Sequence, residues 1–427
     1  MSRSCRILLM ASLVIGGASG GVLAQGQHQL EPVRYATTKD DNAVTRLDAR
    51  IAAGEVTLAP AGRSGRLVPL LQALGVPVSS QTLVFSKTSL QRHRISLRNP
   101  RAIYFGPDVY VGWVPGAASL EVTAGDPRLG FVFYRLPQDP AVPARFERDD
   151  SCLSCHASPR TDDEPGLLLR SVFPDREGDA IASAGETQVS TSTPLAERWG
   201  GWLVTGRFTG AHRGNGAAMR GERGDWIVQG RVATDLHAFE EQFAVDDYPV
   251  ATSDIGALLA LEQQATVHNL LVQASIQVRV ALARDAQVNE VLHETGVRPS
   301  TERLLDARAR QIAAALLLAD EPSLVEHHAA PEPTFAAAFA SLWPRDANGT
   351  SLGRIDLGER TFVLPMSPMV HSPAFAALPE LLRERVLERL RVSCDRGRLP
   401  GGVRMSFAQR TTLHAHLSEL VPGYVVR

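Results

Sequence analysis

Long apolar runs, blocks of like charge and lysine are all scarce in this chain of 427 residues. The formal net charge is -2 and no block of one sign stands out, so nothing suggests a nucleic acid or an anionic membrane surface as a partner. After the N-terminal region, no stretch approaches the roughly 18 uncharged apolar residues of a membrane-spanning helix. Lysine occurs only at Lys39 and Lys87, so almost all cationic side chains are arginine.

The N-terminus has the layout of a secretory signal. Residues 1–6 carry positive charge, residues 7–23 are apolar or small, and Val22-Leu23-Ala24 has the small-residue pattern of a cleavage site. Glycines interrupt the apolar stretch, which disfavours a retained membrane anchor. We therefore predict that residues 1–24 are a signal peptide and that the mature protein is exported to the periplasm.

Cysteine is scarce too, with four residues, of which Cys5 falls within the predicted signal. Two of the others belong to the sequence CLSCH at residues 152–156. A CxxCH pattern attaches a haem through two thioether bonds, and the histidine that follows ligates the iron. We therefore predict one covalent haem c, held by Cys152 and Cys155, with His156 as the proximal iron ligand.

These cysteines have two other possible roles. A thioredoxin-like redox disulfide needs a strand before the motif and a helix that begins at its first cysteine, whereas Asp149-Asp150-Ser151 precedes it and Pro159 follows. A structural zinc site needs four ligands, and only Cys394 and scattered histidines remain to complete one. Cys394 is expected to be a buried free thiol, with an intermolecular disulfide as the alternative.

The residue that faces His156 across the haem decides what the haem does, because electron carriers usually place Met or His there, while enzymes and gas binders leave the position open. Met366 and Met369 are candidates because prolines stiffen the segment at residues 364–369. The alternative is that both methionines fill gaps in the core.

Two histidines are further candidates, either as distal ligands or as distal acid/base groups. His268 lies on the apolar face of an expected long helix, where a core histidine with a polar partner is the alternative. His212 lies in a glycine-rich segment at residues 210–215, where an exposed loop histidine is the alternative. The haem propionates need donors, for which the polar or indole groups nearest in sequence are Arg160, Arg170, Arg198, Trp199, Trp202, Arg207 and Arg213.

The pattern along the chain changes once. Short helices are expected at residues 43–53 and before Gly75, and strands follow at residues 82–85, 102–105, 109–114, 120–123, 130–136, 170–173, 180–182 and 202–205. Helical periodicity takes over at residues 255–282, 301–318, 335–342, 379–392 and 407–420. We predict an α+β protein, with a β-rich haem-bearing domain at residues 25–252 and an all-α domain at residues 253–427 that packs on it.

Four phrases near the motif carry a resemblance: FSKTSLQ at residues 85–91, YVGW at 110–113, RSVFPD at 170–175 and ERWGGW at 197–202. In these phrases the chain resembles a group of large secreted bacterial monohaem c-type cytochrome proteins. The resemblance runs from about Tyr35 to the C-terminal helices and implies haem binding and redox chemistry, with no settled substrate. These relatives carry His where this chain has Gln263, so if that histidine and His268 form a functional pair in the relatives, its loss weakens the same role here.

Three functions are compatible with these observations. The first is an exported one-electron carrier that serves a redox partner protein. The second is a haem enzyme, peroxidase-like or oxygen-activating, with an open distal face and assistance from His268 or His212. Because only one CxxCH is present, the double-haem form of a peroxidase is disfavoured. The third is a haem-bearing sensor or binding protein.

Overall fold

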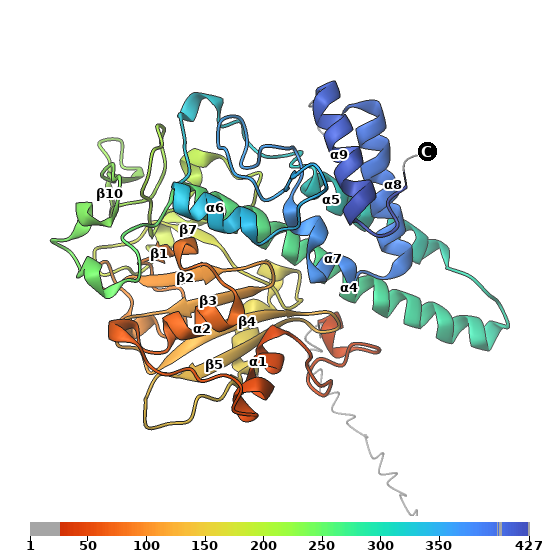
Figure 1. Ribbon diagram of the computed structural model, residues 1–427, viewed down its shortest axis with the longest axis horizontal. Helices are drawn as coiled ribbons and strands as arrows, with labels where there is room; N and C mark the ends of the chain where they lie inside the picture. The colour runs from red at the N-terminus through yellow and green to blue at the C-terminus, as the bar shows by residue number, and fades with distance from the viewer. Residues whose placement is uncertain (1–25, 399, 401–403, 426–427) are drawn as a thin grey trace, which may run out of the picture.

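The computed structural model describes residues 26–398, 400 and 404–425. The predicted signal peptide, residues 1–24, lies outside the described residues. An antiparallel sheet fills one side of the molecule and helices from the second half of the chain fill the other (Figure 1). The predicted α+β class, with a β-rich part followed by a helical part, is confirmed.

The main sheet has seven strands in the order β6-β5-β4-β3-β2-β1-β9. Every neighbouring pair is antiparallel, and β1 to β6 follow one another across the sheet. Two ribbons, β7-β8 and β10-β11, lie outside it. The strands are β1 (Thr82–Val84), β2 (Arg101–Phe105), β3 (Val109–Trp113), β4 (Ser119–Asp126), β5 (Gly130–Pro137), β6 (Glu147–Arg148), β7 (Arg170–Val172), β8 (Glu186–Gln188), β9 (Trp202–Leu203), β10 (Ala218–Arg220) and β11 (Trp226–Val228).

The two faces of the sheet have different coverings because side chains alternate along each strand. Helices α1 (Ala43–Ala52) and α2 (Leu67–Leu74) pack on one face. The Asn42 side chain caps α1 and donates a 2.7 Å hydrogen bond to the hydroxyl of Tyr134 on β5. The opposite face carries Tyr110, Phe131 and Phe133, and it turns toward α4.

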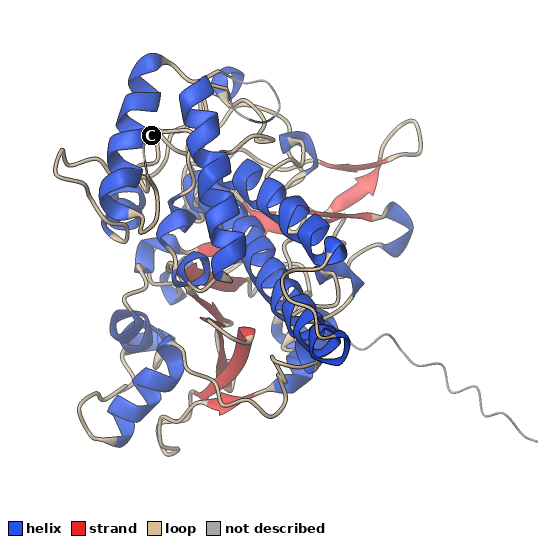
Figure 2. Cartoon of the chain, turned by 90° about the vertical axis from the view of Figure 1, so that its right-hand side faces the viewer, coloured by secondary structure: helices blue, strands red, loops and turns tan. Residues whose placement is uncertain are grey.

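The helical part is built around the 38-residue helix α4 (Ile255–Leu292), which is longer than the predicted 255–282. Helix α5 (Pro299–Leu316) packs against both α4 and α8 (Glu380–Arg396), and α9 (Phe407–Leu420) packs on α8. Figure 2 shows the long helices side by side across the middle of the molecule. The remaining α-helices are α3 (Leu153–His156), α6 (Pro333–Ser341) and α7 (Pro373–Ala376).

One hydrophobic core joins the two parts. The ring of Phe105 on β2 lies 6.1 Å from the rings of both Phe335 and Phe339 on α6. The strand predicted at residues 180–182 is wrong, because Ala182 begins a 3-10 turn and only Ala180 forms an isolated bridge. Among the described residues, no helix combines the length and apolarity needed to cross a membrane.

Candidate functional site

A cavity of about 920 Å³ opens on the face of the sheet that is turned toward α4. Ile103, Gly112 and Glu121, which are neighbours across β2, β3 and β4, contribute to its floor. Leu261 and Ala265 from the first turns of α4 also line it. The volume lies within the 300–1,000 Å³ of small-molecule and cofactor sites.

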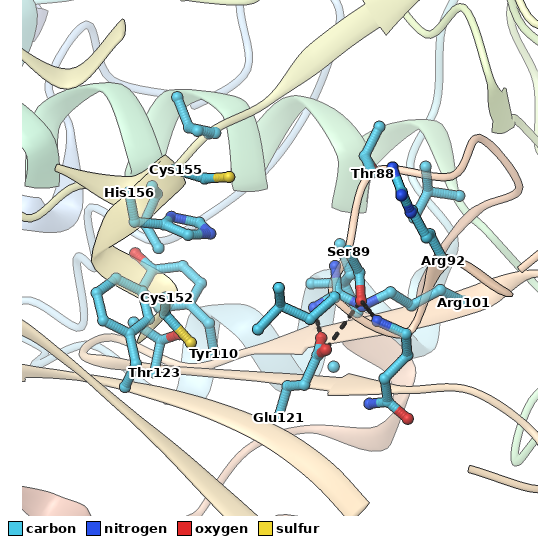
Figure 3. A pocket seen from close by; sticks show the side chains of 18 of the residues that line it. Thr88, Ser89, Arg92, Arg101, Tyr110, Glu121, Thr123, Cys152, Cys155 and His156 are labelled. Carbon is cyan, nitrogen blue, oxygen red and sulfur yellow. Dashed lines mark hydrogen bonds and ion pairs between the residues drawn. The ribbon is translucent and has the colours of Figure 1, made fainter. Parts of the chain in front are cut away.

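The CxxCH motif forms one end of this cavity. A 3-10 turn, capped by the Asp149 side chain, leads into the short helix α3. All three motif side chains line the cavity, and Cys152 and Cys155 are free thiols (Figure 3). Local structure therefore brings together the three residues that the sequence predicted as the attachment site.

His156 is oriented by a backbone carbonyl. Its Nδ1 lies 2.7 Å from the carbonyl oxygen of Gly166, so Nδ1–H donates this bond, and Nε2 keeps its lone pair with no hydrogen-bond partner among the described residues. The ring of Phe133 packs beside it, with centroids 4.8 Å apart. Burial lowers the pKa of His156, although the bond to Gly166 opposes the shift. The imidazole is therefore held neutral, which is the form that ligates a metal.

The thiol of Cys152 is held protonated. Burial, with smaller contributions from Asp149 and Glu121, raises the pKa of Cys152 to about 12. Cys394 lies buried on α8 and does not line the cavity. Cys394 is therefore not placed to join Cys152 and Cys155 in a zinc site.

A polar cluster lies at the other end of the cavity (Figure 3). Arg101 pairs with Glu121, and the Ser89 hydroxyl donates a 2.8 Å hydrogen bond to the same carboxylate. Burial raises the pKa of Glu121, but Arg101 and the hydrogen-bond donors outweigh it and hold that pKa below its usual value. Gly112 makes room for the pair, since a Cβ there would lie 2.3 Å from Nη2 of Arg101.

His268 does not line the cavity and lies behind Tyr110, which does. Its Nδ1 is 3.1 Å from the Tyr110 hydroxyl, which also accepts a 2.9 Å bond from the amide of Gln264. Its Nε2 lies 3.5 Å from Oδ1 of Asp108. Burial lowers the pKa of His268 to about 3. His268 is thus a neutral core histidine that supports Tyr110.

The other predicted distal residues also lie away from the cavity lining. Met366 and Met369 are fully buried core residues. Ser367, between them, donates a 3.0 Å hydrogen bond to the side-chain oxygen of Gln263. That bond ties the proline-stiffened segment to α4. His212 packs its ring against those of Trp199 and Phe208.

The predicted propionate partners divide into two groups. Arg160, Arg170 and Trp202 line the cavity, whereas Trp199, Arg198, Arg207 and Arg213 do not. Arg198 is buried in an ion pair with Glu262. The Nε atoms of Arg170 and Arg101 are buried without a hydrogen-bond partner. Both guanidinium groups already pair through their terminal nitrogens, Arg101 with Glu121 and Arg170 with Glu186.

A further segment of the cavity lining was not predicted from the sequence. The 3-10 turn at Arg92–Arg94 brings two arginines and His93 to the cavity. Each of the four phrases that carry the resemblance supplies at least one lining residue, for example Ser89, Tyr110, Arg170 and Trp202. The turn follows directly after the first phrase, and that adjacency is the signal that could have identified it.

Comparisons of the chain with family models, with curated proteins and with solved structures found no match.

Proposed function

We propose that this protein is an exported c-type cytochrome that holds one haem through Cys152 and Cys155, with His156 as the proximal ligand. One observation carries the proposal: the three motif side chains line one cavity, and His156 donates through Nδ1 to Gly166 so that Nε2 is free. A hydrogen bond at the second ring nitrogen fixes the tautomer and orientation of a metal-ligating histidine.

The rest of the cavity suits the cofactor as well. Its lining carries seven cationic side chains and two carboxylates, in a protein of net charge -2, and this excess of positive charge complements two propionates. Leu167, Leu169 and Leu261 supply an apolar wall for a porphyrin face.

The activity we propose is one-electron transfer to or from a redox partner protein in the periplasm. Haem, when bound, supplies the one-electron chemistry. The chain fixes the orientation of His156 and keeps the cavity electropositive, both of which tune a reduction potential.

A second candidate function is a haem enzyme, and the Arg101–Glu121–Ser89 cluster favours it. Figure 3 shows this cluster facing His156 across the cavity. A guanidinium there can donate hydrogen bonds to a small ligand, and an ionised carboxylate can accept a proton. This candidate requires an open distal position.

The attachment is tested by secretion of the full chain from a cell that performs c-type maturation. We expect the mass of one haem on the mature chain and a pyridine haemochrome typical of two thioether bonds. Cys152→Ser and Cys155→Ser should each change that haemochrome. Cys394→Ser is the matched control, because Cys394 lies outside the cavity. A wild-type chain without covalent haem would refute the proposal.

Carrier and enzyme are separated by spectra of the loaded wild-type protein. A low-spin haem that ignores peroxide and carbon monoxide supports the carrier, since both axial positions are then filled. A high-spin haem that binds either molecule supports the enzyme.

A further inference from the structure

The segment at residues 87–94 closes the end of the cavity that faces the CxxCH motif. All eight of its residues line the cavity. Figure 3 shows Ser89 and Arg92 of this segment across the cavity from His156. The segment contains His93, the one cavity-lining histidine besides His156 among the described residues.

Most other cavity-lining side chains that can ligate iron are already engaged. Lys87 Nζ lies 2.5 Å from the carboxylate of Asp179. The Tyr110 hydroxyl is occupied by His268 and Gln264. Neither group reaches an iron without losing these bonds.

The carboxylates and the second tyrosine are engaged too. Glu121 pairs with Arg101, and Asp149 pairs with Arg135 at 2.9 Å while capping the turn before the motif. Tyr134 bonds to Asn42 and Asp40 near α1. No methionine lines the cavity within the part of the chain that the structure describes.

His93 differs from these residues because its imidazole has no polar or aromatic partner among the described residues. It has no side-chain hydrogen bond, ion pair or aromatic contact among the described residues, and it is exposed. Its neighbours hold the segment in place. Ser89 bonds to Glu121, and the Gln91 amide donates a 3.3 Å bond to the carbonyl of Ser119 at the start of β4. Ile95, which follows the turn, is buried against Val114 and Ala117.

We propose that His93 is the distal iron ligand, so that the haem is ligated by two histidines, His156 and His93. This inference rests on the proposed covalent haem and specifies its sixth ligand. Two imidazoles give a six-coordinate, low-spin haem, with a lower reduction potential than His/Met ligation. The arrangement suits an electron carrier and leaves no open position for a peroxide or a gas.

The test uses full-length, haem-loaded protein and reads its electronic spectrum, electron paramagnetic resonance and carbon monoxide binding. We expect a low-spin wild type that does not bind carbon monoxide. His93→Ala should be high-spin and bind carbon monoxide, and added imidazole should restore the low-spin spectrum. His237→Ala is the matched control, because His237 is also exposed on a 3-10 turn but lies outside the cavity lining, and it should keep the wild-type spectrum.

A second variant covers the case in which His93→Ala fails to keep its haem. His93→Met should remain low-spin, gain a thioether-to-iron charge-transfer band and show a higher reduction potential. A high-spin wild type would overturn the inference, and so would a low-spin spectrum that His93→Ala and His93→Met both leave unchanged. Either result leaves the proposed cytochrome intact, whereas a wild-type chain without covalent haem refutes that proposal itself.

Discussion

At the scale of single residues, Arg198 and Glu262 form the most deeply buried arginine–carboxylate pair among the described residues, with side chains 3% and 5% exposed. Arg198 Nη1 lies 2.7 Å from the carboxylate, and its other nitrogens donate to the carbonyls of Thr193 and Thr191. This network ties the loop before the ERWGGW phrase, residues 197–202, to α4. Glu262 follows the cavity-lining Leu261 on that helix. Arg198 is therefore a structural residue, although its position in sequence suggested a propionate partner.

Arg198→Met should lower the free energy of unfolding by about 3–5 kcal/mol, because it leaves the Glu262 carboxylate buried without a counter-charge. The double variant Arg198→Met/Glu262→Met should lose less than the single variant, since it removes the stranded charge. Urea unfolding followed by circular dichroism measures both.

A surface pair provides the comparison for this prediction. Arg385 pairs with Glu302 and Asp306 on the helical side, and its side chain is 28% exposed. Arg385→Met should lower the free energy of unfolding by no more than about 1 kcal/mol, because solvent screens such pairs. Equal losses from the single and double variants at Arg198 and Glu262 would show that packing, rather than charge, sets the cost.

Only part of the candidate site could be predicted from the sequence. The proximal side is predictable because Cys152, Cys155 and His156 are adjacent in one short motif. His93 is more than fifty residues away from them and reaches the cavity only through strand pairing and the bonds of Ser89 and Gln91. His268 was predicted correctly as buried, but the sequence could not show that Tyr110 stands between it and the cavity.

At the scale of elements, α4 begins at a buried carboxylate. Asp254 is 1% exposed, and its Oδ1 accepts hydrogen bonds from the backbone N–H groups of Gly256 and Ala257. Its Oδ2 has no hydrogen-bond partner. Burial raises the pKa of Asp254 from 3.8 to about 6, even though its backbone hydrogen bonds act in the opposite direction.

The carboxyl group of Asp254 therefore binds its proton more tightly in the folded protein than in the unfolded chain. The contribution of Asp254 to stability is complete below pH 4 and is lost as the pH rises through about 6. Asp254→Asn keeps a good helix cap and removes the ionisation. Relative to wild type, its free energy of unfolding should rise between pH 4 and pH 7.5 by at most about 3 kcal/mol. Urea unfolding at several pH values measures this difference.

Asp254→Ala is the control, because it removes both the charge and the cap. Its free energy of unfolding should depend on pH in the same way as that of Asp254→Asn, but should be about 1 kcal/mol lower because the helix cap is lost. A difference between Asp254→Asn and wild type that stays constant across this pH range would contradict the argument.

Local patterns were enough to find most elements. Helix α1 begins after the polar residue Asn42, and α2 ends at Gly75, which has a positive φ of 66°. Burial alternates along β4 from Ser119 to Ala124, whereas β5 is buried at every position from Gly130 to Tyr134, where both faces of the sheet are covered. The failure at residues 180–182 has a local cause, because the chain there turns back on itself after the bridge between Pro174 and Ala180.

At the scale of the whole molecule, the predicted boundary at residues 252 and 253 coincides with the change from strands to helices. The core nevertheless crosses this boundary. Phe105 packs against Phe335 and Phe339, and the Gln264 amide donates a 2.7 Å bond to the carbonyl of Gly106. Leu261 and Ala265 complete the cavity from the helical side. A change in periodicity marks where the elements change, but it cannot show which of them share a core.

Because the two parts share a core and a cavity wall, we expect them to unfold together. Urea titration of the haem-loaded protein should give the same midpoint by the haem Soret band and by far-ultraviolet circular dichroism, which is dominated by the helices. Residues 26–252 expressed alone should fail to fold, because without α4 the apolar face of the sheet around Phe131 and Phe133 is left uncovered. Two separate transitions, together with a folded fragment that binds haem, would instead establish residues 25–252 and 253–427 as independent domains.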